Sequence, residues 1–160
     1  AAMVAAAESA RGLARLAGLR VADVPGATGG YRTDYAAKAA CAMKLLDECD
    51  LVAVHVASPA EASLAGDVDR KVGALSDIDA MLVAPLFDFA AGRGDVRMMF
   101  LATHRCPVAR RTRTHQETPV ALFGPGMDAF RKATFSEANA ASGEVEVKHG
   151  SDLLSYFLRD

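Results

Sequence analysis

The chain has 160 residues, of which 51% are hydrophobic, and its 18 basic and 20 acidic side chains leave a formal net charge of −2. This length is typical of a single domain, and a charge so close to zero argues against nucleic acid or an anionic membrane as the partner. The three cysteines show no paired spacing, which argues against a disulfide framework and favours a reducing, cytoplasmic location.

The first third of the sequence alternates between helical and extended patterns. Apolar residues recur at helical spacing over 2–16, and LRVADV at 19–24 is typical of a strand. PGATGG at 25–30 predicts a tight turn, and a second helix is expected over 34–48. DLVAVHV at 50–56 is nearly all apolar, as expected for a strand buried on both faces of a parallel sheet.

The middle of the sequence continues the alternation. A loop is predicted over 57–66, and the longest helix over 67–91, where apolar residues recur at spacings of three and four and Pro85 is expected to kink or end the helix. VRMMFLA within 95–102 predicts a third strand, and a polar, arginine-rich loop covers 103–118.

The last third predicts a fourth strand over 119–124, a helical start at 135–140 and a closing helix over 150–160 capped by Ser151. Alternating strands and helices indicate an α/β fold, with a mainly parallel sheet, helices on both faces and one domain over 1–160. No apolar run approaches the roughly 18 residues that a membrane span needs, so we expect no membrane contact.

Candidate chemistry is sparse at the carboxyl ends of the predicted strands, where such sheets form their sites. His104 and His115 follow the third strand and could share a metal ion, although both are also ordinary residues for a polar loop. The turn Gly26–Gly30 lacks the dinucleotide-binding spacing but could present N–H groups to a phosphate. Lys38, behind this turn, could reach an anion or simply be solvated.

Five motifs occur in order along the chain: PGATG, TDY followed by Lys38, VHV, the GD before the long helix, and RTRTH. Together they resemble the archaeal-type, cofactor-independent phosphoglycerate mutases of the alkaline phosphatase superfamily. The resemblance covers almost the whole chain and implies the C-terminal half of an alkaline-phosphatase-like core, without the cap domain. It also implies two divalent metals, manganese or zinc, and a serine nucleophile that moves a phosphoryl group between the 2- and 3-hydroxyls of glycerate.

The metal ligands that the resemblance implies are mostly replaced. After VHV, the family reads Glu-Ala-Pro-Asp-Glu-Ala-x-His and binds one metal through that Asp and His, but here these positions are Ala60 and Leu64. The Asp-His pair that binds the other metal is Thr103-His104. Only His104 and His115 remain of five ligands, so we expect no bound metal pair. The resemblance also implies that the nucleophilic serine belongs to an N-terminal segment, which we expect to be missing here.

Three functions remain open at this point. The chain could be half of a phosphoglycerate mutase, an isomerase of glycolysis, with Lys38 as a substrate-binding residue. It could instead be a non-catalytic scaffold or interaction subunit, partnered by the missing N-terminal half or by another chain. A third possibility is a residual anion binder that uses the Gly26–Gly30 turn, Lys38, His104 and nearby arginines.

Overall fold

The computed structural model describes residues 1–127 and 133–158. The chain separates into two compact units. Unit one comprises 1–89 and 106–113, and unit two comprises 90–105 and 114–160. The single domain over 1–160 stays a prediction.

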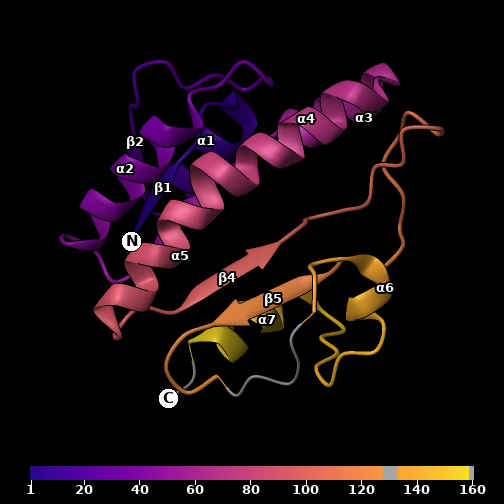
Figure 1. Cartoon of the computed structure of the whole chain (residues 1–160). Helices are drawn as coiled ribbons and strands as arrows, with labels where there is room; N and C mark the ends of the chain where they lie inside the picture. The colour runs from indigo at the N-terminus through magenta and orange to yellow at the C-terminus, as the bar shows by residue number, and fades with distance from the viewer. Residues whose placement is uncertain (128–132, 159–160) are drawn as a thin grey trace. The chain divides into compact units, whose positions relative to one another are not determined.

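Unit one is built on a parallel sheet of three short strands in the order β2-β1-β3 (Figure 1). These strands are β1 (Ala2–Val4), β2 (Arg20–Ala22) and β3 (Val52–Val54). The helix predicted over 2–16 is therefore wrong at its start, because residues 2–4 form the central strand. A central strand of a parallel sheet is covered on both faces, so its sequence lacks the alternation that identifies a half-exposed strand.

Helices α1 (Glu8–Leu16) and α2 (Tyr35–Leu46) connect the strands. The chain moves from β1 to β2 in one direction and then passes back across β1 to β3. Right-handed crossovers therefore put α1 and α2 on opposite faces of the sheet, as the sequence predicts. Helix α2 begins where the carboxylate of Asp34 accepts the N–H of Ala37 at 2.8 Å. The core cluster under α2 comprises Ala2, Val4, Ala42 and Leu45.

The loop predicted over 57–66 is wrong, because most of these residues form helix α3 (Ser58–Ala65). Pro59 lies in its first turn, where a missing N–H costs no helical hydrogen bond, and Gly66 ends it with a left-handed φ of +78°. A Ser-Pro pair followed by small residues is compatible with a loop and equally with the start of a helix.

The long helix predicted over 67–91 is confirmed, with one interruption. It comprises α4 (Val68–Ile78), a π-helical turn η1 (Asp79–Val83) and α5 (Ala84–Arg93), which follow one another as a nearly continuous rod (Figure 1). The wide turn lies directly before Pro85. Proline lacks an N–H and its ring crowds the carbonyl four residues back, so the helix widens there rather than ending.

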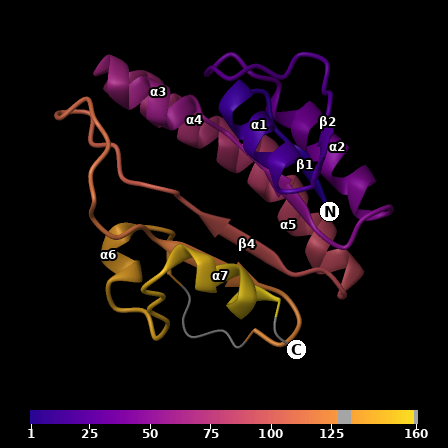
Figure 2. The ribbon, with the colours of Figure 1, turned by 180° about the vertical axis from the view of Figure 1, so that it is seen from behind.

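Unit two contains an antiparallel ribbon of β4 (Met98–Leu101) and β5 (Val120–Phe123). The segment between these strands contains no crossover helix, and antiparallel pairing needs none. Two short helices follow, α6 (Glu137–Ala140) and α7 (Gly150–Phe157). Figures 1 and 2 show α7 on one face of the ribbon.

The cap predicted for the last helix is wrong. His149 occupies the N-cap position of α7, and Ser151 instead contacts the Asp152 carboxylate at 3.3 Å. The last two residues of that predicted helix, 159–160, lie outside the described residues. Across the described part of the chain, no helix combines the length and the apolar character needed to cross a membrane.

Candidate functional site

The carboxyl ends of β1 and β3 lie side by side in the sheet of unit one, where the strand order reverses. Open α/β sheets usually bind ligands at such a point. Here the Gly-rich turn closes over the end of β1, because a Cβ added to Gly29 would lie 3.6 Å from the Ala7 Cα. The main chain and the methyl group of Ala7 therefore lie directly against this turn.

The Gly-rich turn uses several of its polar groups internally. The N–H of Thr28 donates to the Thr33 hydroxyl at 2.9 Å, and the N–H of Gly30 donates to the Thr28 hydroxyl at 3.3 Å. The Gly26 carbonyl accepts the N–H of Asp34 at 3.0 Å. These bonds fix the shape of the turn, and they engage two of the N–H groups that an anion would need.

Lys38 lies beneath this turn and is only 1% exposed. Its Nζ donates to the carbonyls of Thr28 and His55, both at 3.4 Å, so it connects the Gly-rich turn to the end of β3. Burial lowers the pKa of the Lys38 ammonium, because the charged form loses its hydration. The structure thus shows Lys38 bridging two loops, and its role in binding substrate stays a prediction.

His55 follows β3 directly and its N–H donates to the Val4 carbonyl at 2.8 Å. Burial lowers the pKa of its imidazole, and the positive charge of Lys38 lowers it further. The sequence placed this histidine inside a buried strand; in the structure it is half-buried and stands at the carboxyl end of that strand.

The free energy of unfolding should depend on pH through the half-buried imidazole of His55. Because the pKa of His55 is lower in the folded than in the unfolded chain, the unfolded chain binds the proton first as pH falls. We expect the free energy of unfolding to fall as pH drops below about 6.5, and the loss to be complete once the folded-state pKa is passed. Urea denaturation of His55→Asn should show a flatter profile over this range. An unchanged profile would contradict the assignment.

A buried hydroxyl pair joins α2 to α3, and sequence reasoning missed it. The Tyr35 hydroxyl and the Ser58 hydroxyl lie 2.7 Å apart, and both side chains are buried. The Ser63 hydroxyl, also fully buried, donates to the Pro59 carbonyl at 2.8 Å. The only signal in the sequence is a serine between an apolar strand and a proline, which is also typical of a loop.

We expect this hydroxyl pair to be coupled energetically. Tyr35→Phe leaves the Ser58 hydroxyl buried without its partner, which costs about 1–3 kcal/mol of folding free energy. Ser58→Ala should cost a similar amount, whereas the double variant should cost clearly less than the sum, because no orphaned group remains. Urea unfolding of the three variants gives the coupling. Strictly additive losses would show that the two hydroxyls do not interact.

Helix α3 carries the two positions at which the resemblance implies metal ligands. Leu64 is exposed rather than folded over the site, and Ala60 presents a methyl group. The Ala60 carbonyl accepts a weak hydrogen bond from the Cys106 thiol at 3.9 Å. The segment 106–113 thus packs against α3, and the Arg111 guanidinium lies against Gly66 at the end of that helix.

The two remaining histidines belong to unit two. An isolated antiparallel bridge pairs Arg105 with Thr114, whose N–H donates to the Arg105 carbonyl at 3.0 Å. His104 precedes one partner of this bridge and His115 follows the other, so both predicted residues flank the same bridge. The hydroxyl of Thr103, which replaces the implied aspartate, lies 2.9 Å from His104 Nδ1.

The donor set does not fit a metal pair. Within 1–127 and 133–158, no three side chains of His, Cys, Asp or Glu are grouped so that they could hold an ion. Catalytic zinc sites use three protein ligands, and harder divalent ions require several carboxylate oxygens. The assignment of His104 and His115 as metal ligands therefore stays a prediction.

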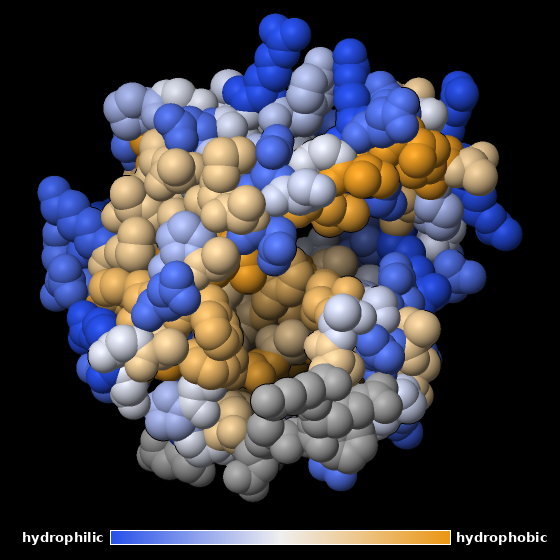
Figure 3. Space-filling view, viewed as in Figure 1, coloured by the Kyte–Doolittle hydropathy of each residue, from blue (hydrophilic) through white to orange (hydrophobic). Residues whose placement is uncertain are grey.

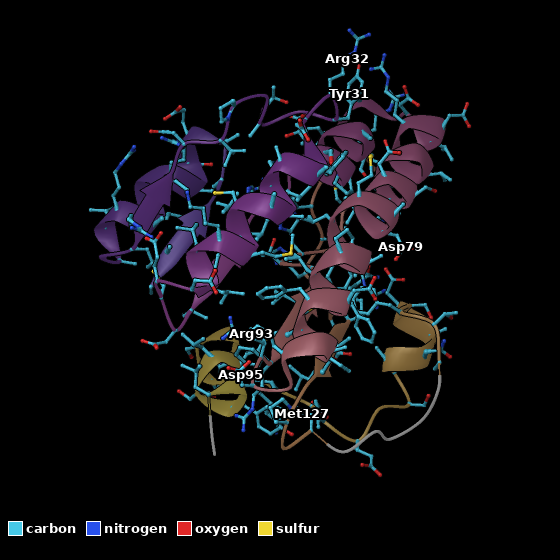
Figure 4. The ribbon with its side chains drawn as sticks, turned by 60° about the vertical axis from the view of Figure 1, so that its left-hand side comes forward. Tyr31, Arg32, Asp79, Arg93, Asp95 and Met127 are labelled. Carbon is cyan, nitrogen blue, oxygen red and sulfur yellow. The ribbon has the colours of Figure 1, made fainter. Side chains whose placement is uncertain are left out.

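Polar side chains around the Gly-rich turn engage one another. The Arg70 guanidinium stacks on the Tyr31 ring at 4.5 Å from its centroid, and its Nε pairs with the Asp67 carboxylate at 3.1 Å. Figure 4 shows Tyr31 and Arg32 together at one end of unit one. The Glu61 carboxylate also approaches Gly30, since a Cβ there would lie 3.2 Å from it. This negative charge disfavours an anion at the turn.

The comparisons with known proteins agree with the resemblance. Two similar proteins named 2,3-bisphosphoglycerate-independent phosphoglycerate mutase come from Methanothrix thermoacetophila, 35% identical over 96% of this chain, and Methanosarcina acetivorans, 31% identical over 99%. A probable one from Geobacter sulfurreducens is 32% identical over 98% of this chain. The chain spans about 40% of the length of these relatives (39%, 40% and 40%).

A solved structure, that of the PH0037 protein from Pyrococcus horikoshii, superimposes with a TM-score of 0.93 at 25% identity, covering 98% of this chain and 47% of that one. It supports the predicted α/β fold. The family description that matches residues 1–151 is that of the Metalloenzyme superfamily. The chain therefore belongs to the Metalloenzyme superfamily and is mutase-like, as the motifs in its sequence predict.

Proposed function

We propose that this chain is a phosphoglycerate-mutase-like module that does not catalyse phosphoryl transfer with its own residues and acts as a scaffold or interaction subunit. One observation carries the proposal. On α3, a methyl group at Ala60 and an exposed isobutyl group at Leu64 occupy the two positions where the family pattern has metal-binding Asp and His.

The proposal depends on the positive charge that bound divalent metal ions would supply. Metal-assisted phosphoryl transfer relies on divalent ions to activate the nucleophile and to neutralise the phosphoryl oxygens. Loss of an outer-shell partner alone typically weakens metal binding by about 10–100-fold, so loss of three direct ligands should abolish tight binding. Two imidazoles and the neutral hydroxyl of Thr103 do not replace the missing carboxylates.

The same argument applies if a further segment supplies a serine. The chain spans about 40% of its relatives' length, so a complementary part could lie in the same protein or in another chain. Without the ligands at positions 60, 64 and 103, such a serine would lack the ions that activate it. We propose the remainder of a mutase fold, or another protein, as the partner, in a cytoplasmic setting.

An assay of phosphoglycerate mutase and phosphatase activity tests the proposal. The purified chain, supplied with Mn²⁺ or Zn²⁺ and 3-phosphoglycerate, should form no 2-phosphoglycerate above the rate of the uncatalysed control, and should release no inorganic phosphate. The full-length relative from Methanothrix thermoacetophila serves as the positive control. Metal-dependent turnover that is lost in His115→Ala would establish the enzyme and sink the proposal.

A further inference from the structure

Residues 106–113 form a small loop that belongs to unit one, although the chain before and after it belongs to unit two. The N–H groups of Arg110 and Arg111 both donate to the Pro107 carbonyl, at 3.0 and 3.1 Å. The antiparallel bridge of unit two joins the two ends of the loop. The loop therefore keeps its shape through backbone hydrogen bonds that do not involve the helices it contacts.

Few contacts attach this loop to the helices of unit one. Lys71 Nζ donates to the Cys106 carbonyl at 3.0 Å, and the Cys106 thiol makes its weak 3.9 Å hydrogen bond to α3. Cys106 is the one buried residue among the eight, whereas residues 109–113 are all exposed. The loop leaves the side chains of Leu64 and Val68 45% and 57% exposed, and apolar surface remains visible at the upper right of Figure 3, in the region of α3 and α4. Polar contacts with little apolar burial are typical of segments of low local stability.

A further contact holds a strained residue against a glycine. Arg111 has a φ of +50°, in the left-handed region that residues other than glycine rarely adopt. A Cβ added to Gly66 would lie 2.7 Å from Arg111 Cζ, so the guanidinium occupies the space that a side chain would need there. Gly66 ends α3, where the helix dipole favours a positive charge. Backbone strain of this kind persists only while surrounding contacts hold it, and it is typical of segments that switch.

We propose that residues 106–113 are a strap that opens and closes over the end of α3 without global unfolding of the chain. When the strap is closed, Arg111 fits against Gly66 and the Cys106 thiol is buried on α3. When it is open, the strain at Arg111 is released, Lys71 is freed, and the thiol is exposed to reagents in solvent. Each of these contacts lies within unit one, so the inference does not depend on where unit two or any further segment of the protein lies. It is also independent of the proposed function.

Thiol labelling measures the opening of the strap. In a Cys41→Ser/Cys49→Ser background Cys106 is the one remaining cysteine, and labelling by N-ethylmaleimide, followed by mass spectrometry, reports its exposure. Because local opening exposes little surface, the labelling rate should be nearly independent of urea well below the unfolding midpoint. A labelling rate that rises with urea as steeply as global unfolding does would overturn the proposal.

Two glycine substitutions test the contact with Arg111. Gly66→Ala should raise the labelling rate about tenfold or more, because the added methyl group displaces the guanidinium and strains a φ of +78°. Gly18→Ala is the matched control, since Gly18 follows α1 with a φ of +76° but has nothing within 4 Å of its Cβ position. The control should leave the labelling rate unchanged, and equal acceleration in the two variants would overturn the proposal.

A lysine substitution tests the strap without changing Gly66. Lys71→Met removes the hydrogen bond to the Cys106 carbonyl and should raise the labelling rate severalfold. Lys44→Met, at an exposed lysine of α2, should leave the rate unchanged. Circular dichroism and the urea midpoint establish that each variant is folded. An unchanged rate in Lys71→Met would overturn the proposal even if Gly66→Ala fails to fold.

Discussion

Restoring the three replaced ligands should create tight zinc or manganese binding. In Ala60→Asp/Leu64→His/Thr103→Asp, each substitution restores a carboxylate or an imidazole that the family resemblance implies, two of them on α3 and one beside His104. Direct ligands contribute at least as much as the outer-shell partners, whose loss costs about 10–100-fold each, so three should raise the affinity by about three orders of magnitude or more. Isothermal titration of the variant and the parent chain with Zn²⁺ measures the gain.

The control for this experiment moves one new ligand to a neighbouring position. Ala65→His carries the added imidazole on α3 but one residue away from Leu64, which turns it to another face of the helix. Combined with the same two aspartates, it should bind far more weakly than the triple variant. Equal affinity for the two would mean that position 64 has no special place in a metal site.

Gly124→Ala should unfold unit two locally. Gly124 has a φ of +124°, which L-residues rarely adopt, and an added Cβ would lie 2.6 Å from the Val96 carbonyl oxygen and 2.8 Å from the Arg97 Cα. Because the obstacles include backbone atoms of the segment leading into β4, they cannot move aside cheaply. We expect a loss of about 3 kcal/mol or more of local stability, from the strained φ together with the overpacking.

The consequence should extend beyond the turn itself. Arg97 Nε donates to the Pro125 carbonyl at 2.8 Å and Arg97 also donates to the Phe157 carbonyl at 3.2 Å, so it connects this turn to the end of α7. Hydrogen exchange should therefore show faster exchange of amides in β4, β5 and α7. Gly92→Ala is the matched control: Gly92 lies within α5 with open space around it, so the change should stabilise by about 0.5–1 kcal/mol. Unchanged exchange in Gly124→Ala would contradict the argument.

Periodicity and capping residues were enough to predict part of the fold. The helical pattern over 34–48 and the apolar repeat of the long rod predicted α2, α4 and α5, and the expected strands at 95–102 and 119–124 appear as β4 and β5. The prediction from sequence was wrong at β1, because an alanine-rich stretch is compatible with a helix as well as with a central strand. It also failed at α3, because a Ser-Pro start does not distinguish a helix from a loop.

The candidate site, like the fold, could be predicted only in part from the sequence. The replacement of ligands at Ala60, Leu64 and Thr103 was visible from motif order alone. The Tyr35–Ser58 hydroxyl pair was not, because its partners are 23 residues apart and their burial depends on how α2 packs against α3. The bridge between Arg105 and Thr114, which His104 and His115 flank, could not be predicted either, since the arginine-rich segment has no strand pattern.

Metal content is the most direct measure of the central claim, which is that this mutase-like fold no longer concentrates divalent charge. The chain is expressed in medium supplemented with manganese and zinc, dialysed without chelator, and analysed by inductively coupled plasma mass spectrometry. The account predicts far less than one equivalent of either metal per chain, unchanged in His115→Ala. One or two equivalents per chain that disappear in His115→Ala would contradict it.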